Sequence, residues 1–158
     1  MVPITNIALI AAALGSSLIA GIFFAFSTFI MQAFARLPAE QGIAAMQSIN
    51  TTILRSPFMV VFLLTLALSV FIAVMAIVHW RGGISVLMLA GAALYIVTTF
   101  LSTIVFNVPL NDALDKVDGR TTEAATLWAT YLSDWTRWNH LRTAASLLAS
   151  CAFVRALF

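Results

Sequence analysis

Three long runs of apolar residues constrain this chain more than any other feature of its sequence. They cover residues 7–34, 58–80 and 84–106, and each exceeds the roughly 20 residues that a helix needs to cross a bilayer. Of the 158 residues, only 9% are charged, against about 25% in a soluble domain. So few charged residues cannot cover the surface of a soluble globular protein. The chain must therefore present apolar side chains to lipid.

A fourth apolar run, residues 141–158, is shorter and contains Arg142 and Arg155. This run can still span the membrane if the two arginine side chains extend toward opposite interfaces. In lipid, backbone N–H and C=O groups must form their hydrogen bonds within their own segment. These runs are therefore expected to be helices. The sequence therefore predicts an all-α fold, in which residues 1–158 form one integral membrane domain. Its expected architecture is an antiparallel bundle of four transmembrane helices.

The connections between the spans differ in length. Arg81-Gly82-Gly83 is expected to form a tight turn between the second and third spans, whereas residues 35–56 and 107–140 are long. Counting the crossings places both long segments on the same side of the membrane. Pro109 disfavours helical backbone at the residue before it, so the third span is expected to end at Val108.

Both long segments are expected to contain interfacial helices. Pro38-Ala39-Glu40 opens the first, and Thr121 or Thr122 caps the second, which is expected to continue into the fourth span. The first helix has an apolar face at helical spacing, made of Ile43, Met46, Asn50 and Ile53.

Basic residues indicate the orientation. The long segments and the start of the fourth span contain Arg36, Arg55, Lys116, Arg120, Arg137 and Arg142. The opposite side has Arg81 and Arg155, so the positive-inside rule places the long segments in the cytoplasm and both termini outside. No run of Lys or Arg is present, so the expected partner is the lipid bilayer and not nucleic acid.

The strongest polar constellation lies on the helix that enters the fourth span. One face of that helix carries Trp128, Tyr131, Trp135, Trp138, Asn139 and Arg142. His140 lies beside this stripe. One interpretation is an aromatic belt at the lipid headgroups, with Arg142 extended to the interface. The other is an aromatic-walled pocket with an amide and a cation at its floor, which suits planar ligands with anionic oxygens.

Three asparagines on the same side of the membrane add hydrogen-bonding groups. Asn107 and Asn111 bracket Pro109 at the end of the third span, and Asn50 lies on the apolar face of the first interfacial helix. Each amide alone is better explained by a structural role, as a helix cap or as a buried group bonded to the backbone. Their shared side of the membrane favours a common site.

Other chemistries have less support in the sequence. His79 and His140 fall at opposite membrane faces, and no HxxH, CxxC or carboxylate cluster lies within a span, so no metal site is predicted. No cofactor is indicated. A ridge of small residues in the first span favours close packing within the bundle or, alternatively, a homo-oligomer interface. Its members are Ala13, Ser17, Gly21 and Ala25.

Four stretches of the chain resemble one known family. They are GIFFAFS at 21–27, MQSIN at 46–50, NVPLND at 107–112 and WTRWNHLRT at 135–143. Together they are similar to the anthrone oxygenase-like family of small four-helix membrane proteins, which implies a place in a bacterial inner membrane. Fungal relatives in that family oxidise anthrones to anthraquinones without an established cofactor. The matched positions are Asn50, Asn107, Asn111, Trp135, Asn139 and Arg142.

The resemblance and the stripe together give candidate site residues. The expected substrate-binding side chains are those of Asn50, Asn107, Asn111, Trp135 and Trp138. For catalysis, His140 is expected to accept a proton, Arg142 to stabilise the resulting anion and Asn139 to orient its oxygens. The resulting hypothesis is a membrane oxidoreductase that acts with oxygen on a planar aromatic or quinol-like small molecule. The alternatives are a non-catalytic membrane subunit and a small-molecule binding or permeation protein.

Overall fold

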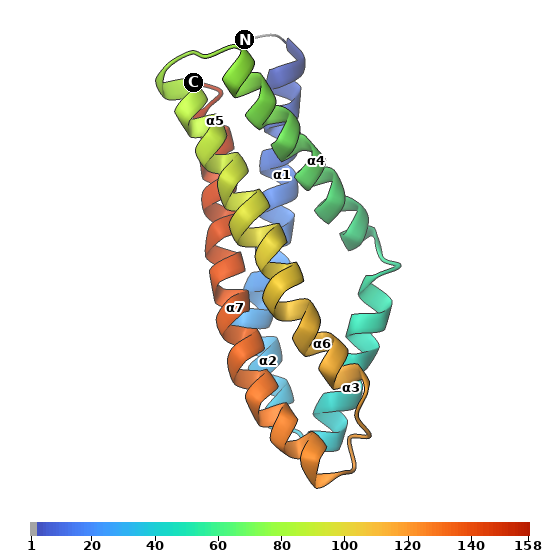
Figure 1. The fold of residues 1–158 in the computed structure, drawn as a ribbon. Coiled ribbons are helices and arrows are strands. Elements are labelled where there is room, and N and C mark those ends of the chain that lie inside the picture. Colours follow the sequence, from blue (N-terminus) through green and yellow to red (C-terminus); the bar gives the residue numbers. More distant parts are fainter. Residues whose placement is uncertain (1–2) are drawn as a thin grey trace.

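A computed structural model of the protein describes residues 3–158, and that part of the chain contains helices and no strands. The helices form four columns that run side by side (Figure 1). The first column is α1 (Pro3–Ala25), η1 (Phe26–Ile30) and α2 (Met31–Phe34). The second is α3 (Ala39–Ile53) and α4 (Pro57–Val78). The third is α5 (Gly83–Ala93), η2 (Leu94–Leu101), η3 (Thr103–Asn107) and α6 (Val108–Asp115), and the fourth is α7 (Thr122–Arg155).

Three helices are long and apolar enough to cross a membrane, and they correspond to the three long apolar runs, the second of which ends two residues earlier than expected, at Val78. Their bounds are Pro3–Phe34, Pro57–Val78 and Gly83–Asp115. Their outer faces expose large apolar side chains such as Ile7, Leu14, Val60, Leu64 and Val97. Such faces are compatible with contact to a lipid bilayer, as the composition predicts.

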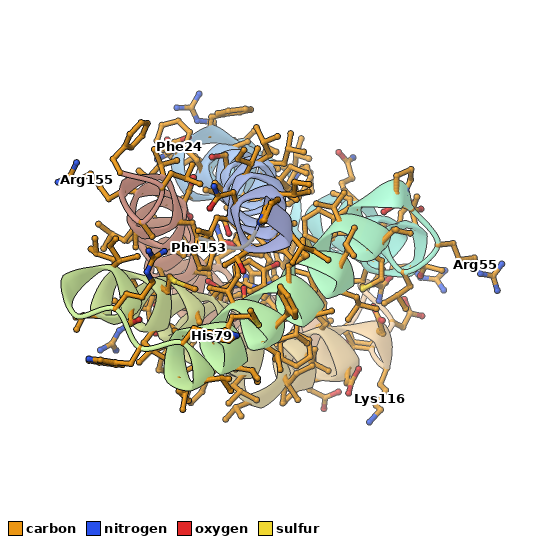
Figure 2. The ribbon with its side chains drawn as sticks, turned by 90° about the horizontal axis from the view of Figure 1, so that it is seen from above. Phe24, Arg55, His79, Lys116, Phe153 and Arg155 are labelled. Carbon is orange, nitrogen blue, oxygen red and sulfur yellow. The ribbon has the colours of Figure 1, made fainter. Side chains whose placement is uncertain are left out.

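The two ends of the molecule differ. Both described chain ends and the turn between α4 and α5 lie at one end, and the α2–α3 and α6–α7 connections lie at the other (Figure 1). The expected turn before α5 is present, and Gly82 adopts a φ of 61° there, a left-handed conformation that only glycine adopts easily. The view along the columns shows Phe153 between the helices, whereas Phe24 and Arg155 point outward (Figure 2).

The third helix corrects one expectation. It does not end at Val108, which has helical angles of φ −60° and ψ −47° and continues into α6. The preceding segment η3 is a π-helix, in which the Val108 N–H bonds to the Thr103 carbonyl five residues earlier. This wider turn places Pro109 in the first turn of α6, a position where a helix tolerates a residue without an N–H.

The segments expected to be interfacial helices are helical, and they lengthen the columns instead of lying across the end of the bundle. Helix α3 is stacked on α4 and lies beside α6 and α7 (Figure 1). Helix α7 is unbroken over 34 residues, and the Thr121 hydroxyl caps it by accepting a 3.1 Å hydrogen bond from the Ala124 N–H. In the turn before α7, hydrogen bonds from Arg120 hold the pKa of the exposed Asp118 carboxyl below its usual range.

The buried apolar side chains form two clusters along the bundle. The first lies between α1, α4, α5 and the C-terminal half of α7, and includes Phe23, Phe62 and Phe153. The second lies between α2, α3, α6 and the N-terminal half of α7, and includes Met46 and Trp135. The interval between these clusters, at the middle of the columns, contains the candidate site.

Candidate functional site

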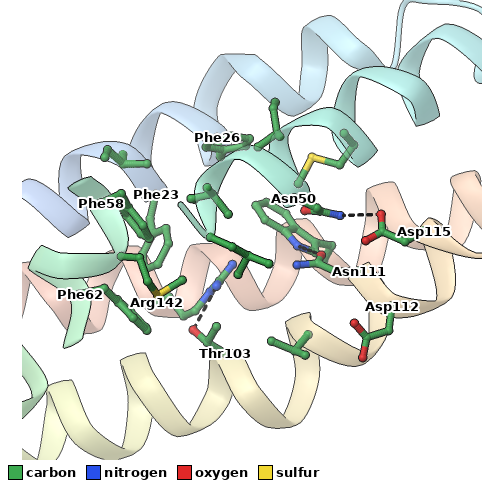
Figure 3. A pocket seen from close by; sticks show the side chains of 18 residues that line it. Phe23, Phe26, Asn50, Phe58, Phe62, Thr103, Asn111, Asp112, Asp115 and Arg142 are labelled. Carbon is green, nitrogen blue, oxygen red and sulfur yellow. Dashed lines mark hydrogen bonds between the residues drawn. The ribbon is translucent and has the colours of Figure 1, made fainter. Parts of the chain in front are cut away.

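A cavity of about 250 Å³ lies between the two apolar clusters. Side chains from α1, η1, α3, α4, η3, α6 and α7 line it (Figure 3), and they include aromatic, aliphatic and polar residues. Ligand pockets usually measure roughly 300–1,000 Å³, so this cavity suits one small molecule. Two of the three π-helical segments, η1 and η3, border it, and such wide turns occur frequently at functional sites.

We call the ring side chains that line the cavity the aromatic wall: Phe23, Phe26, Phe58, Phe62 and Trp135. Their rings form two groups, one of Phe26 with Trp135 and one of Phe23, Phe58 and Phe62. The Phe26 and Trp135 ring centroids are 5.6 Å apart, those of Phe23 and Phe58 6.1 Å, and Phe58 stacks on Phe62 at 5.8 Å. Rings in this arrangement offer flat apolar surfaces to a planar ligand.

Arg142 brings the only cation among the residues that line this cavity. Its side chain is 3% exposed, and its guanidinium carbon lies 4.4 Å from the Phe23 ring centroid and 5.2 Å from that of Trp135. One terminal nitrogen, Nη1, donates to the Thr103 hydroxyl at 3.1 Å and the other, Nη2, to the Asn139 amide oxygen at 3.0 Å.

The charge of Arg142 has no carboxylate partner. Within residues 3–158, the one ion pair joins Arg120 to Asp118, and neither of these residues lines the cavity. A guanidinium carries five N–H donors, and the Arg142 Nε is buried without a hydrogen-bond partner. Desolvating an unpaired cation is costly, so a ligand with an anionic or electron-rich oxygen would be favoured here.

Asn139 holds Arg142 against the first column. It is fully buried, and its Nδ2 donates to the Phe23 carbonyl at 2.6 Å and to the Ser27 hydroxyl at 2.7 Å. These contacts tie α7 to the end of α1 and the start of η1. The Asn139 amide oxygen in turn accepts a 3.0 Å hydrogen bond from the Arg142 Nη2. Asn139 does not line the cavity, so it acts here by positioning the arginine.

Asn111 fixes the orientation of the aromatic wall on α7. Its amide oxygen accepts hydrogen bonds from the Tyr131 hydroxyl at 2.8 Å and from the Trp135 Nε1–H at 2.9 Å. Tyr131 lies between Trp128 and Trp135, with ring centroids 5.6 Å and 6.0 Å away. Asn111 itself lines the cavity, so one amide both orients Trp135 and presents polar atoms to a ligand.

One end of the cavity is formed by Asn50, Asp112 and Asp115, and we call this end its mouth. All three line the cavity, and both carboxylates are exposed. The lining side chains of Ile22 and Leu54 are exposed as well. The Asn50 Nδ2 lies 3.5 Å from the Asp115 carboxylate oxygen. Figure 3 shows the two carboxylates at one end of the cavity and Arg142, Phe58 and Phe62 at the other.

The sequence-based candidates therefore fall into three groups. Asn50, Asn111, Trp135 and Arg142 line the cavity. Asn139 and Asn107 lie behind its wall, and the buried Asn107 donates to the Trp135 carbonyl at 3.2 Å.

Trp138 and His140 form the third group, because neither lines the cavity. Trp138 stacks on the Phe106 ring at 3.6 Å. His140 is exposed on the outer face of α7. The structure thus does not bring His140 together with Arg142, and the proton acceptors that do line the cavity are Asp112 and Asp115.

Several lining residues were absent from the sequence-based candidates: Phe23, Phe26, Phe58, Phe62, Thr103, Asp112 and Asp115. Part of their signal was available, since Phe23 and Phe26 lie within the stretch 21–27 and Asp112 ends the stretch 107–112. The described residues contain no group of three or more His, Cys, Asp or Glu side chains that could hold a metal ion.

Comparison with known proteins gives one match. A family model described as anthrone oxygenase matches residues 58–152, which is more than half of the chain. The matched part runs from α4 into the C-terminal half of α7 and includes Asn111, Trp135 and Arg142. No curated protein and no solved structure matches the chain.

Proposed function

Because the chain belongs to the anthrone oxygenase family, we propose that it is a membrane oxidoreductase that oxidises a planar aromatic or quinol-like small molecule with oxygen. The observation that carries this proposal is Arg142, a cation that is 3% exposed and has only neutral partners. Five aromatic rings form part of the wall of its cavity. This combination favours a flat ligand that develops negative charge on an oxygen during the reaction.

An anthrone-type substrate illustrates the chemistry. Loss of one proton from the ring methylene converts the ketone into an aromatic oxyanion, and Arg142 stabilises that anion. Asp112 and Asp115 are the carboxylates that line the cavity, so they accept the proton. The anion is electron-rich and reduces oxygen. One oxygen atom becomes the new carbonyl, and the other leaves as water with the two former methylene hydrogens.

The proposal predicts catalysed oxygen uptake by the purified protein in lipid nanodiscs. With anthrone as the probe, uptake and quinone formation should exceed the spontaneous rate by at least about 10²-fold, since oxyanion stabilisation alone contributes about 10²–10³. An oxygen electrode and the quinone absorbance measure this, with heat-denatured protein as the blank. A rate equal to the blank, together with no anaerobic anthrone binding, would contradict the proposal. Binding without oxygen uptake would instead support a binding protein.

The chain as a whole is proposed to form one membrane domain of four antiparallel spans. The exposed face of α7 changes from polar to apolar at Leu141. Before it the exposed side chains include Glu123, Asp134, Arg137 and His140, and after it they include Leu147, Leu148 and Val154. This change supports a fourth span that begins near Leu141, with its first arginine turned into the cavity instead of toward the interface.

The proposed orientation places both termini away from the cytoplasm. We expect a reporter that is active only in the cytoplasm to work when it is inserted in the turn between α6 and α7, and to be silent when fused after Phe158. The reason is the excess of basic residues at the α3 and α6 end of the columns. The opposite pattern of activity would reverse the orientation, and activity at both positions would contradict the fourth span.

A further inference from the structure

We propose that Asp112 and Asp115 make the mouth an electrostatic filter, which admits neutral ligands and excludes molecules that are already anionic in water. On this inference the oxyanion that Arg142 binds is formed inside the cavity. The substrate class is then a neutral weak acid, such as a phenol or an enolisable ketone, and not a carboxylate or sulfonate. The inference rests on the proposed function, because it concerns which charge state of a ligand reaches Arg142.

The geometry supplies two opposite charges at the two ends of one cavity. Asp112 and Asp115 are three residues apart on α6, line the mouth and are exposed. Arg142 lies at the other end, buried among Phe23, Phe58 and Phe62 (Figure 3). A ligand that enters at the mouth therefore passes the carboxylates before it reaches the guanidinium.

Nothing at the mouth neutralises these carboxylates. Neither takes part in an ion pair among the described residues, where the pair recorded is Arg120 with Asp118. The neighbouring cations are Arg55, before α4, and Lys116, after Asp115. Both project away from the helices (Figure 2), and neither lines the cavity. The one contact that a carboxylate makes in the cavity is with the neutral Asn50 amide.

The expected discrimination is modest and depends on salt. An anion that passes within a few ångströms of a carboxylate in water is repelled by about 1 kcal/mol per charge, whereas a neutral molecule feels almost no such force. Repulsion at an entrance lowers the association rate more than it raises the dissociation rate. A barrier of this kind weakens when the Debye length falls to about 3 Å at 1 M salt.

Anaerobic association kinetics with two tricyclic probes, neutral anthrone and anionic anthracene-2-carboxylate, test the filter. The double variant Asp112→Asn, Asp115→Asn removes both charges and keeps the side-chain shapes. Asp134→Asn is the matched control, because Asp134 is exposed on α7 and does not line the cavity. We expect the double variant to bind the carboxylate about three- to tenfold faster at low salt and anthrone at an unchanged rate. The control should change neither rate.

Each other outcome overturns the filter. It is wrong if the wild type associates with both probes equally fast, if the double variant speeds both probes equally, or if Asp134→Asn has the same effect. It is also wrong if the discrimination persists unchanged at 1 M salt. In all these cases anthrone still binds, so the proposed function survives. A wild-type protein that binds neither probe would overturn the proposed function as well.

Discussion

Replacing Arg142 with lysine should lower the rate of anthrone oxidation by about 10²–10³-fold, the usual effect of removing one oxyanion-stabilising group. Lysine keeps the positive charge but cannot reproduce the planar fork that contacts Thr103 and Asn139 and stacks over Phe23. The protein should stay folded. Oxygen uptake at saturating anthrone and thermal unfolding in detergent measure the two properties separately, and full activity in the lysine variant would remove Arg142 from the site.

Arg142→Leu provides the matched structural control. It leaves the Asn139 oxygen without its donor, but it also removes a buried cation that has no carboxylate partner. Replacing buried charges with apolar side chains is often neutral or stabilising. We therefore expect the leucine variant to unfold at the wild-type temperature or above, and to be inactive. A leucine variant that fails to fold would show that the arginine is needed for the structure itself.

Helical periodicity predicted five of the six residues on the inner face of α7 correctly, whereas Trp138 is only half-buried and stacks on Phe106. Trp128, Tyr131, Trp135, Asn139 and Arg142 are all buried there, because residues three, four and seven apart share one face. The same geometry explains why His140 lies outside. It follows Asn139 by one residue and is therefore rotated by about 100° from the centre of the buried face. The expectation for His140 came from the suitability of histidine as a general base near pH 7, and the helical periodicity already placed it beside the stripe.

The sequence could not predict that Phe58 and Phe62 belong to the aromatic wall. They lie in an apolar run where lipid-facing and inward-facing residues have the same composition, since lipid and protein interior are equally apolar. Only the packing of α1 against α4 and α7 separates them. The continuation of the third helix past Val108 was equally hidden, because it depends on the π-helical turn at Thr103–Asn107, and local propensity does not encode that turn.

Asn111→Leu should destabilise the protein by about 2–5 kcal/mol, because it leaves two buried donors without an acceptor and each such loss costs about 1–3 kcal/mol. The donors are the Tyr131 hydroxyl and the Trp135 Nε1–H. Asn111→Asp keeps an acceptor in the same place and should retain most of the stability. Unfolding in detergent, followed by tryptophan fluorescence, measures both variants. A leucine variant as stable as the wild type would show that this amide does not hold the wall.

A double-mutant cycle with Tyr131→Phe isolates the contribution of the hydroxyl. In the wild type, Tyr131→Phe removes a donor that has a partner, so it should cost about 1 kcal/mol. In the Asn111→Leu background the same change removes a donor that has no partner. It should therefore leave the stability of the protein unchanged or raise it. The coupling between the two positions should therefore be about 1–3 kcal/mol. Additive effects would mean that the 2.8 Å contact between Tyr131 and Asn111 contributes little, and that ring stacking alone positions Trp135.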